Sequence, residues 1–218
     1  MKTGKAVLKL LSENEGEFLS GEAIAEKLNI SRSSVWKSVS ELRRQGCDIT
    51  AVTNKGYMLG KGGNVLSSDA IKSFLESGIY TVEVRDSVSS TNAQLKQAAE
   101  NGAPEFTVLA ANNQTSGRGR KGRSFYSPPG SGLYMSLLLR PKISAEKALG
   151  ITTCAAVACA RAVERVSNRH AMIKWVNDIY TDGKKVCGIL TEASVDFEGG
   201  GLNYAVLGIG INVLPPQG

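Results

Sequence analysis

The sequence changes character at residues 59–64, which read LGKGGN. Three glycines in these six residues carry no hydrophobic periodicity, and such a stretch is typical of a linker between folded units. At roughly 150 residues per domain, the chain of 218 residues is long enough for one or two domains. We therefore predict a first domain over residues 1–62 and a second over residues 63–218.

The overall composition is that of a globular protein. Hydrophobic residues make up 42% and charged residues 21% of the chain, which excludes a collagen, a coiled coil and a disordered chain. No apolar run approaches the roughly 18 residues of a membrane helix, and the N-terminus lacks the small-residue cleavage site of a signal peptide. Four scattered cysteines without a C-x-x-C pair argue against a zinc site or a disulfide framework and favour a reducing cytoplasm. We expect no membrane partner and no protein metal site.

The charge balance permits a polyanionic partner without requiring one. The chain has 26 basic and 20 acidic residues, a formal net charge of +6. The position of these charges is more informative than their sum, because the densest basic cluster of the second domain lies within residues 118–123.

The first domain has the pattern of a winged helix-turn-helix. Apolar spacing predicts helices over residues 3–12, 20–28 and 31–45, and Gly46 is a typical residue after a helix end. Ser20 and Ser31 are good N-caps. Two strands, 48–52 and 56–59, follow around a turn. Two helices joined by a tight turn and followed by a hairpin define this motif.

The third predicted helix is the expected DNA-recognition helix. Side chains near the N-terminus of such a helix meet base edges, while basic side chains hold phosphates. The candidate DNA-binding residues are Ser31, Arg32, Ser33, Ser34, Trp36 and Lys37, with Lys55 at the tip of the wing. The alternative is a protein-binding module with a solvated charged face.

The second domain mixes strands with helices. Strands are predicted over residues 80–84, 106–111, 133–139, 171–175, 185–192 and 204–211, and helices over 91–101 and 144–166. This order predicts an α+β fold with a mixed, largely antiparallel sheet.

A glycine-rich loop carries the densest charge of this domain. Residues 117–122 satisfy G-x-G-x-x-G, but SPPG follows at 127–130, where a dinucleotide fold needs a helix. Glycines let backbone amides approach an anion, and four cations within residues 118–123 should order around a polyanion such as ATP or an acyl-adenylate. The alternatives are a solvated surface loop or a second nucleic-acid patch.

A second candidate is Lys174 in the stretch KWVND at 174–178. Its neighbours Ile173 and Trp175 are apolar, so we expect a partly buried amine that holds a carboxylate or phosphate. An ordinary ion pair between Lys174 and Asp178 is an equal alternative.

Two further stretches are candidates with strong structural alternatives. The stretch 86–92, DSVSSTN, places hydroxyl groups at a strand-to-helix junction, where they suit a ureido or amide ligand or simply cap the helix. Glycines at 188, 208 and 210 either seat a flat ligand against backbone or allow tight strand packing. His170, the single histidine, is expected on the surface, so no histidine-based triad is available.

Together these stretches resemble the biotin protein ligases and, with the winged helix, the bifunctional biotin operon repressor/ligases. The matching motifs are SSTN at 89–92, QTSGRGRKGR at 114–123, GLYMS at 132–136, KWVND at 174–178, KKVCGIL at 184–190 and GIGINV at 208–213. The resemblance implies a catalytic domain of the biotin/lipoate ligase type that takes biotin, ATP and Mg²⁺. The implied ligand-binding residues are Ser90, Thr91, Asn92, Gln114, Gly117, Arg118, Gly119, Arg120, Lys174, Gly188 and Asn212.

The resemblance also implies roles and partners. Lys174 would bridge the biotin carboxylate and the α-phosphate, Arg118 and Arg120 would close over the adenylate, and Asp178 would orient the acceptor amine or a magnesium ion. The implied partners are a biotin carboxyl carrier protein domain and operator DNA, with a homodimer formed when the intermediate and corepressor biotinyl-AMP binds. The alternatives are a non-catalytic biotin-sensing transcription regulator and a lipoate-type ligase.

The sequence departs from the family pattern in places. Val176 stands where the family usually has proline, Phe125 where tryptophan is common and Asn112 where an acidic residue is common. The small C-terminal β-barrel of the family is expected to be absent, because the sequence stops shortly after the GIGINV motif.

Overall fold

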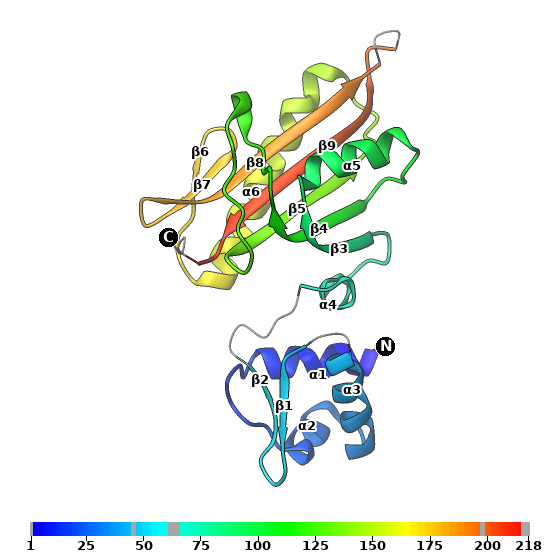
Figure 1. Ribbon diagram of the computed structural model, residues 1–218, viewed down its shortest axis with the longest axis vertical. Coiled ribbons are helices and arrows are strands. Elements are labelled where there is room, and N and C mark those ends of the chain that lie inside the picture. Colours follow the sequence, from blue (N-terminus) through cyan, green and yellow to red (C-terminus); the bar gives the residue numbers. More distant parts are fainter. Residues whose placement is uncertain (1, 45–46, 61–65, 197–198, 215–218) are drawn as a thin grey trace. The chain divides into compact units, whose positions relative to one another are not determined.

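The computed structural model describes residues 2–44, 47–60, 66–196 and 199–214 (Figure 1). The chain forms two compact units, Met1–Gly78 and Ile79–Gly218. This division lies later than the predicted boundary at residue 62. The first unit also contains α4 (Ser68–Phe74), a helix that we did not predict from the sequence. Ala70 of α4 packs on the core of the first unit. Most of the predicted linker lies outside the described residues.

The first unit has the predicted three helices and hairpin. These elements are α1 (Lys2–Ser12), α2 (Gly21–Leu28), α3 (Arg32–Arg44), β1 (Ile49–Val52) and β2 (Gly56–Leu59). The Ser20 hydroxyl accepts a hydrogen bond from Ala23 N at 3.0 Å and so caps α2. Ser31 does the same for Ser34 N at 3.2 Å, at the start of α3. The predicted end of the third helix at Gly46 lies outside the described residues.

The second unit is built on a seven-stranded sheet with the order β3-β4-β5-β9-β8-β7-β6. Only the pair β3–β4 is parallel, which confirms a mixed, largely antiparallel sheet. The strands are β3 (Thr81–Val88), β4 (Thr107–Gln114), β5 (Gly132–Leu139), β6 (Met172–Lys174), β7 (Asp178–Thr181), β8 (Lys184–Val195) and β9 (Leu202–Asn212). β7 was not predicted, and it forms a hairpin with β6 around residues 175–177.

Two helices cover opposite faces of this sheet (Figure 1). On β9, Val206 packs in one core cluster with α5 (Thr91–Glu100), whereas its neighbour Leu207 packs in another with α6 (Ala148–Ser167). Successive side chains of a strand point to opposite faces, so the alternation places α5 and α6 on different sides. The face that carries α5 also presents Gly188, Gly208 and Gly210, and the side chains of Phe125 and Asn92 pack over these glycines.

No helix among the described residues is long and apolar enough to cross a membrane.

Candidate functional site

A cavity lies on the α5 face of the second unit, where the start of α5, β8, β9 and the glycine-rich loop meet. Its volume is about 60 Å³, well below the roughly 300–1,000 Å³ typical of ligand pockets. A ligand of ordinary size therefore requires the loop to move. The lining residues are Ser90, Thr91, Asn92, Gln114, Arg118, Gly119, Arg120, Phe125, Met135, Asn177, Asp178, Lys185, Gly188, Ile189, Leu190, Gly208, Ile209 and Gly210.

The polar end of the cavity is formed by the first residues of α5. Ser90 caps the helix through a hydrogen bond from Ala93 N at 3.4 Å, so its own hydroxyl hydrogen remains available to a ligand. Ser90, Thr91 and Asn92 are each less than 5% exposed. Such buried polar groups persist only with hydrogen-bond partners.

Gln114 connects this end of the cavity with the glycine-rich loop. Its Oε1 accepts a hydrogen bond from Thr91 N at 2.9 Å, and its Nε2 donates to Ser127 Oγ at 2.9 Å. Because a backbone N–H can only donate, the first contact fixes the orientation of the amide. Gln114 is therefore rigidly placed at the end of β4.

The loop 117–125, which we call the arginine loop, folds back on itself as a narrow hairpin. Phe125 N donates to Gly117 O at 2.8 Å, and Gly119 N donates to Arg123 O at 2.7 Å. Its tip is a single 3₁₀ turn, Arg120–Gly122, and not the helix that a dinucleotide fold requires. All four of its cationic side chains are exposed.

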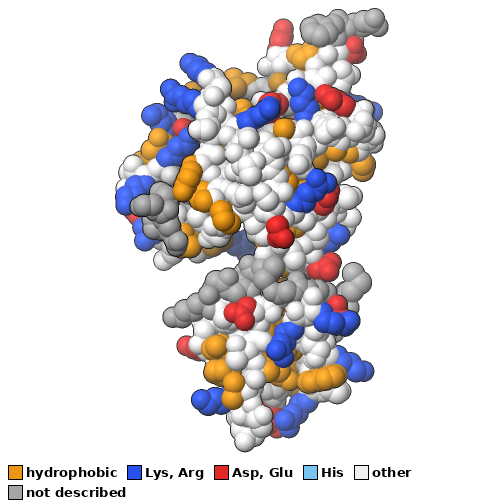
Figure 2. Space-filling view, in the orientation of Figure 1, with side chains coloured by type: hydrophobic (Ala, Val, Ile, Leu, Met, Phe, Trp, Pro, Cys, Tyr) orange, Lys and Arg blue, Asp and Glu red, His pale blue; other side chains and the backbone are white. Residues whose placement is uncertain are grey.

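One side chain of the arginine loop reaches the β6–β7 hairpin. Arg120 Nη1 donates to Asn177 Oδ1 at 2.9 Å. Asn177 is itself held on β8, since its Nδ2 donates to Ile189 O at 3.2 Å and its carbonyl accepts from Ile189 N at 2.9 Å. This contact closes the loop over one side of the cavity. Figure 2 shows Lys and Arg side chains gathered on the side of the unit where the loop and β6 and β7 lie.

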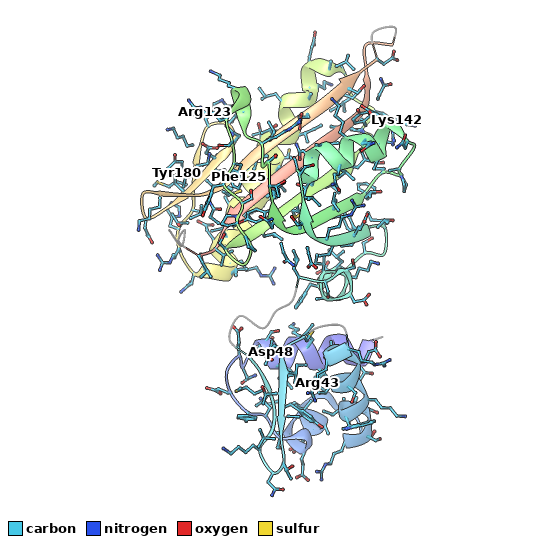
Figure 3. All side chains as sticks on the ribbon, in the orientation of Figure 1. Arg43, Asp48, Arg123, Phe125, Lys142 and Tyr180 are labelled. Carbon is cyan, nitrogen blue, oxygen red and sulfur yellow. The ribbon has the colours of Figure 1, made fainter. Side chains whose placement is uncertain are left out.

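Two of the three glycines predicted to seat a flat ligand, Gly188 and Gly210, lie against the ring of Phe125, which Figure 3 labels. Gly188 and Gly210 are paired across β8 and β9. A Cβ at Gly210 would lie 2.4 Å from Phe125 Cε1, and one at Gly188 would lie 3.0 Å from Cε2. Both positions need glycine because the protein's own aromatic ring packs on the strands.

The structure corrects the predicted burial of Lys174. Its side chain is exposed on the edge strand β6, with Ile173 39% and Trp175 72% exposed, and it does not line the cavity. Its Nζ lies 5.8 Å from the ring centroid of Tyr180. An apolar neighbourhood in sequence predicted burial, but an edge strand has no neighbour to cover it.

A different lysine lines the cavity. Lys185, on β8, forms an ion pair with Asp178 at 2.7 Å, and both side chains are partly shielded from solvent. Asp178 thus pairs with Lys185 and not with Lys174, which was the alternative drawn from the sequence. The KKVCGIL motif contained Lys185, but two adjacent lysines gave no local signal for which one faces inward.

Two other predicted ligand-binding residues do not line the cavity. Gly117 supports the loop, since a Cβ there would lie 2.3 Å from Phe125 O. Asn212 ends β9 opposite Gly132, the first residue of β5. Among the described residues, no cluster of three or more His, Cys, Asp or Glu side chains could hold a metal ion.

The residues that we predicted to bind DNA lie on or next to α3 and the β1–β2 hairpin of the first unit. A groove runs between α3 and the β1–β2 hairpin, lined among others by Arg32, Ser33 and Trp36 from the helix and Asn54 from the hairpin. Trp36 is 61% exposed, whereas tryptophan is on average a largely buried residue. The remaining candidates lie on the same helix or hairpin: Ser31, Ser34, Lys37 and Lys55.

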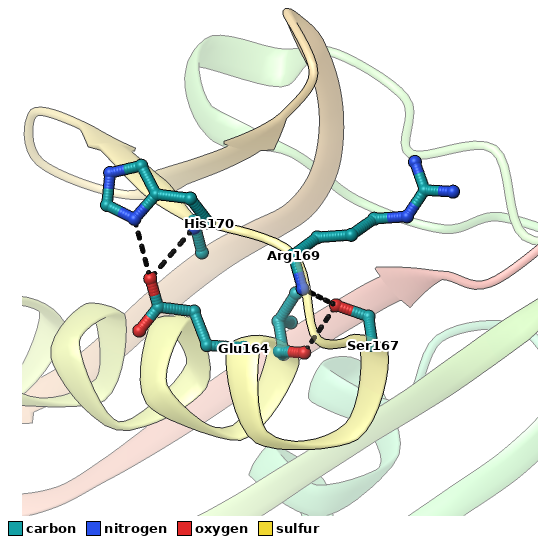
Figure 4. Close-up of polar contacts among 6 residues, drawn as sticks. Glu164, Ser167, Arg169 and His170 are labelled. Carbon is teal, nitrogen blue, oxygen red and sulfur yellow. Dashed lines mark hydrogen bonds and ion pairs between the residues drawn. The ribbon is translucent and has the colours of Figure 1, made fainter.

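His170 lies on the surface, as predicted. Its Nδ1 is 2.9 Å from Glu164 Oε1, which also accepts from Ala171 N at 3.0 Å (Figure 4). The hydrogen bond from Ala171 N and the contact with His170 lower the pKa of Glu164. These contacts tie the end of α6 to the start of β6.

The fold and the cavity define a class of protein. In this class a helix-turn-helix unit is joined to an enzyme-like unit. The cavity of that second unit has hydroxyl and amide groups at one end and cationic side chains at the other. The biotin/lipoate A/B protein ligase family matches residues 84–212, and a helix-turn-helix domain family matches residues 5–58. The chain belongs to the biotin/lipoate A/B protein ligase family.

Individual relatives agree with this assignment. The chain is 40% identical to the bifunctional ligase/repressor BirA of Bacillus subtilis over 211 residues, which is 96% of the chain and 64% of that protein. It is 33% identical to BirA of Escherichia coli over 98% of the chain and 65% of that protein. A solved biotin protein ligase from Aquifex aeolicus in complex with biotin and ATP has a TM-score of 0.52 at 33% identity, covering 63% of this chain and 54% of that one. The chain therefore spans just under two thirds of the length of these BirA proteins.

Proposed function

We propose that the chain is a biotin protein ligase that also represses biotin genes. It forms biotinyl-AMP from biotin and ATP and transfers biotin to a lysine of a carboxyl carrier protein domain. The observation that carries this proposal is the two-ended cavity: hydroxyl and amide groups at Ser90, Thr91 and Gln114 suit a cyclic urea, and Lys185 with Arg118 and Arg120 suits a carboxylate and a phosphate.

In the first half-reaction, a carboxylate oxygen of biotin attacks the α-phosphorus of ATP, and the bond to pyrophosphate breaks. Negative charge accumulates on the phosphoryl oxygens, and cationic side chains held against those oxygens stabilise it. Lys185 supplies one such cation within the cavity, and Arg118 and Arg120 supply two more from the arginine loop. Mg²⁺ is expected to arrive with the ATP phosphates.

In the second half-reaction, the ε-amine of the acceptor lysine attacks the acyl carbon of biotinyl-AMP. AMP leaves, and the new amide bond requires the amine to lose a proton. Asp178 is the candidate for orienting that amine, because its carboxylate lines the cavity. Lys174, at the exposed turn beside Asp178, can reach the phosphoryl group only from the rim.

The first unit supports the regulatory half of the proposal. The exposed side chains of α3 and the β1–β2 hairpin form a surface suited to a DNA groove, with Arg and Lys for phosphates. Bound biotinyl-AMP would order the arginine loop, and a loop ordered in this way can become part of a homodimer interface. A dimer matches a palindromic operator, so biotinyl-AMP acts as the corepressor.

Mass spectrometry after incubation with biotin and ATP tests the catalytic proposal. Retained biotinyl-AMP and released pyrophosphate are the expected products. Biotin binding without either product would instead identify a non-catalytic biotin-sensing regulator, and calorimetric binding of lipoate in place of biotin would identify a lipoate-type ligase. Operator affinity that is equal with and without biotinyl-AMP would refute the corepressor role.

A further inference from the structure

Two donors hold the carboxylate of Asp178, and both reach the same oxygen. Lys185 Nζ lies 2.7 Å from Asp178 Oδ1, and Asn177 Nδ2 donates to that oxygen at 3.0 Å. The donors come from different elements, because Lys185 lies on β8 and Asn177 lies in the turn between β6 and β7. The carboxylate is therefore fixed through Oδ1, and its second oxygen, Oδ2, can accept a hydrogen bond from a bound group.

Asn177 is itself anchored independently of Lys185. Its Nδ2 also donates to Ile189 O at 3.2 Å, and its own carbonyl accepts from Ile189 N at 2.9 Å. On the other side of the amide, Arg120 Nη1 donates to Asn177 Oδ1 at 2.9 Å. Because a carbonyl can only accept and a guanidinium can only donate, these contacts allow one orientation of the amide. Its Nδ2 group therefore points at Asp178 whether or not Lys185 contacts that carboxylate.

The two donors respond differently when an anion enters the cavity. Lys185 lines the cavity, and its ammonium group is a strong partner for a phosphate or carboxylate. A bound anion therefore competes with Asp178 for Lys185. Asn177 carries no charge, and its two Nδ2 hydrogens are already used by Asp178 and Ile189. An anion consequently draws Lys185 away from Asp178 but leaves the contact with Asn177 in place.

We propose that Asn177 is a positioning residue, which keeps the Asp178 carboxylate in place while a ligand anion occupies Lys185. This inference rests on the proposed function, in which Asp178 orients the acceptor amine for attack on biotinyl-AMP. In that step the amine nitrogen bonds to the acyl carbon, the bond from that carbon to the phosphate oxygen breaks, and the amine loses a proton to water. The phosphate of the adenylate engages Lys185 during this step, so Asn177 is the donor that stays on Asp178 Oδ1.

Single-turnover transfer from preformed biotinyl-AMP to a carboxyl carrier protein domain, catalysed by the full chain, tests the proposal. Asn177→Ala should slow this step by about 10-fold or more, because it removes a hydrogen bond to a charged group. In an Asp178→Ala background the same change should cost at least about 3-fold less, and any effect through the arginine loop is common to both backgrounds and cancels. Asn113→Ala is the matched control, since this amide lies outside the cavity lining, donates to Ser87 Oγ at 2.9 Å and should give equal effects in both backgrounds.

Equal losses from Asn177→Ala in the two backgrounds would overturn the inference, because a merely structural role of Asn177 does not depend on Asp178. If Asn177→Ala does not fold, Asn177→Asp keeps an oxygen facing Arg120 and replaces the donor facing Asp178 with an acceptor. That variant should also slow transfer by about 10-fold or more, and transfer at the wild-type rate would again overturn the inference. Absence of transfer by the folded wild-type chain supplied with biotinyl-AMP would instead refute the proposed function.

Discussion

The carboxylate of Asp178 lies 2.7 Å from the ammonium group of Lys185 at the lining of the cavity. The two residues come from adjacent antiparallel strands, β7 and β8. A ligand carboxylate or phosphate that enters the cavity meets an ammonium group that already has an anionic partner. The ion pair therefore keeps Lys185 aimed at the cavity and has to be shared or displaced when an anion binds.

Lys185→Ala should lower biotin-dependent pyrophosphate release by about 100-fold or more, because removing one group that stabilises the developing charge costs roughly 10²–10³-fold in rate. Steady-state kinetics measure the loss. Lys184→Ala is the matched control, since Lys184 is exposed on the same strand and does not line the cavity. Equal losses in both variants would show that general charge, and not the position of Lys185, matters.

Lys174→Ala should slow pyrophosphate release with little change in biotin affinity, because the proposed role of the amine is on the phosphoryl group and its side chain does not line the cavity. Comparing kcat with the calorimetric Kd for biotin separates the two effects. A wild-type rate would remove Lys174 from the reaction.

Asn177→Ala should release the arginine loop, because the hydrogen bond from Arg120 links the loop tip to the β6–β7 hairpin. Trypsin cuts after the basic residues of the loop only when it opens, so limited proteolysis should be faster by about 3- to 10-fold. Biotin with ATP should slow cleavage in the wild-type chain. Equal cleavage rates for variant and wild type would show that the contact does not hold the loop.

Gly208→Ala should destabilise the second unit by about 1–3 kcal/mol, since the new methyl group overlaps the side-chain amide of Asn92. Scanning calorimetry of the full chain measures the change. Gly150→Ala is the control: this glycine lies in α6 with no atom within 4 Å of an added Cβ, so alanine should stabilise by up to about 1 kcal/mol. A neutral Gly208→Ala would mean that Asn92 can move.

Glu164 should give the second unit a pH-dependent stability. Its pKa is lowered by the hydrogen bond from Ala171 N and by His170, so its contribution is present above the ordinary value and is lost as pH falls through the lowered pKa. Glu164→Gln should therefore lower Tm at about pH 7 and by less at about pH 3. Glu146→Gln, at an exposed turn, is the control. A Tm difference independent of pH would contradict this account.

The parts of the site that local sequence predicted are those that local physics fixes. Ser90 begins a helix as an N-cap, and SPPG at 127–130 excludes a helix after the arginine loop. Phe125 lies far along the sequence from Gly188 and Gly210, so its packing on these two glycines carried no local signal. The prediction that Lys174 is buried was wrong for the same reason, because the position of β6 at the sheet edge depends on strand order.

Biotin-dependent exchange of labelled pyrophosphate into ATP tests the central claim most directly, because it reports adenylate formation alone. The account predicts exchange that requires biotin in the wild-type chain, is lost in Lys185→Ala and is kept in Lys184→Ala. No exchange from a folded wild-type chain that binds biotin, or wild-type exchange in Lys185→Ala, would contradict it.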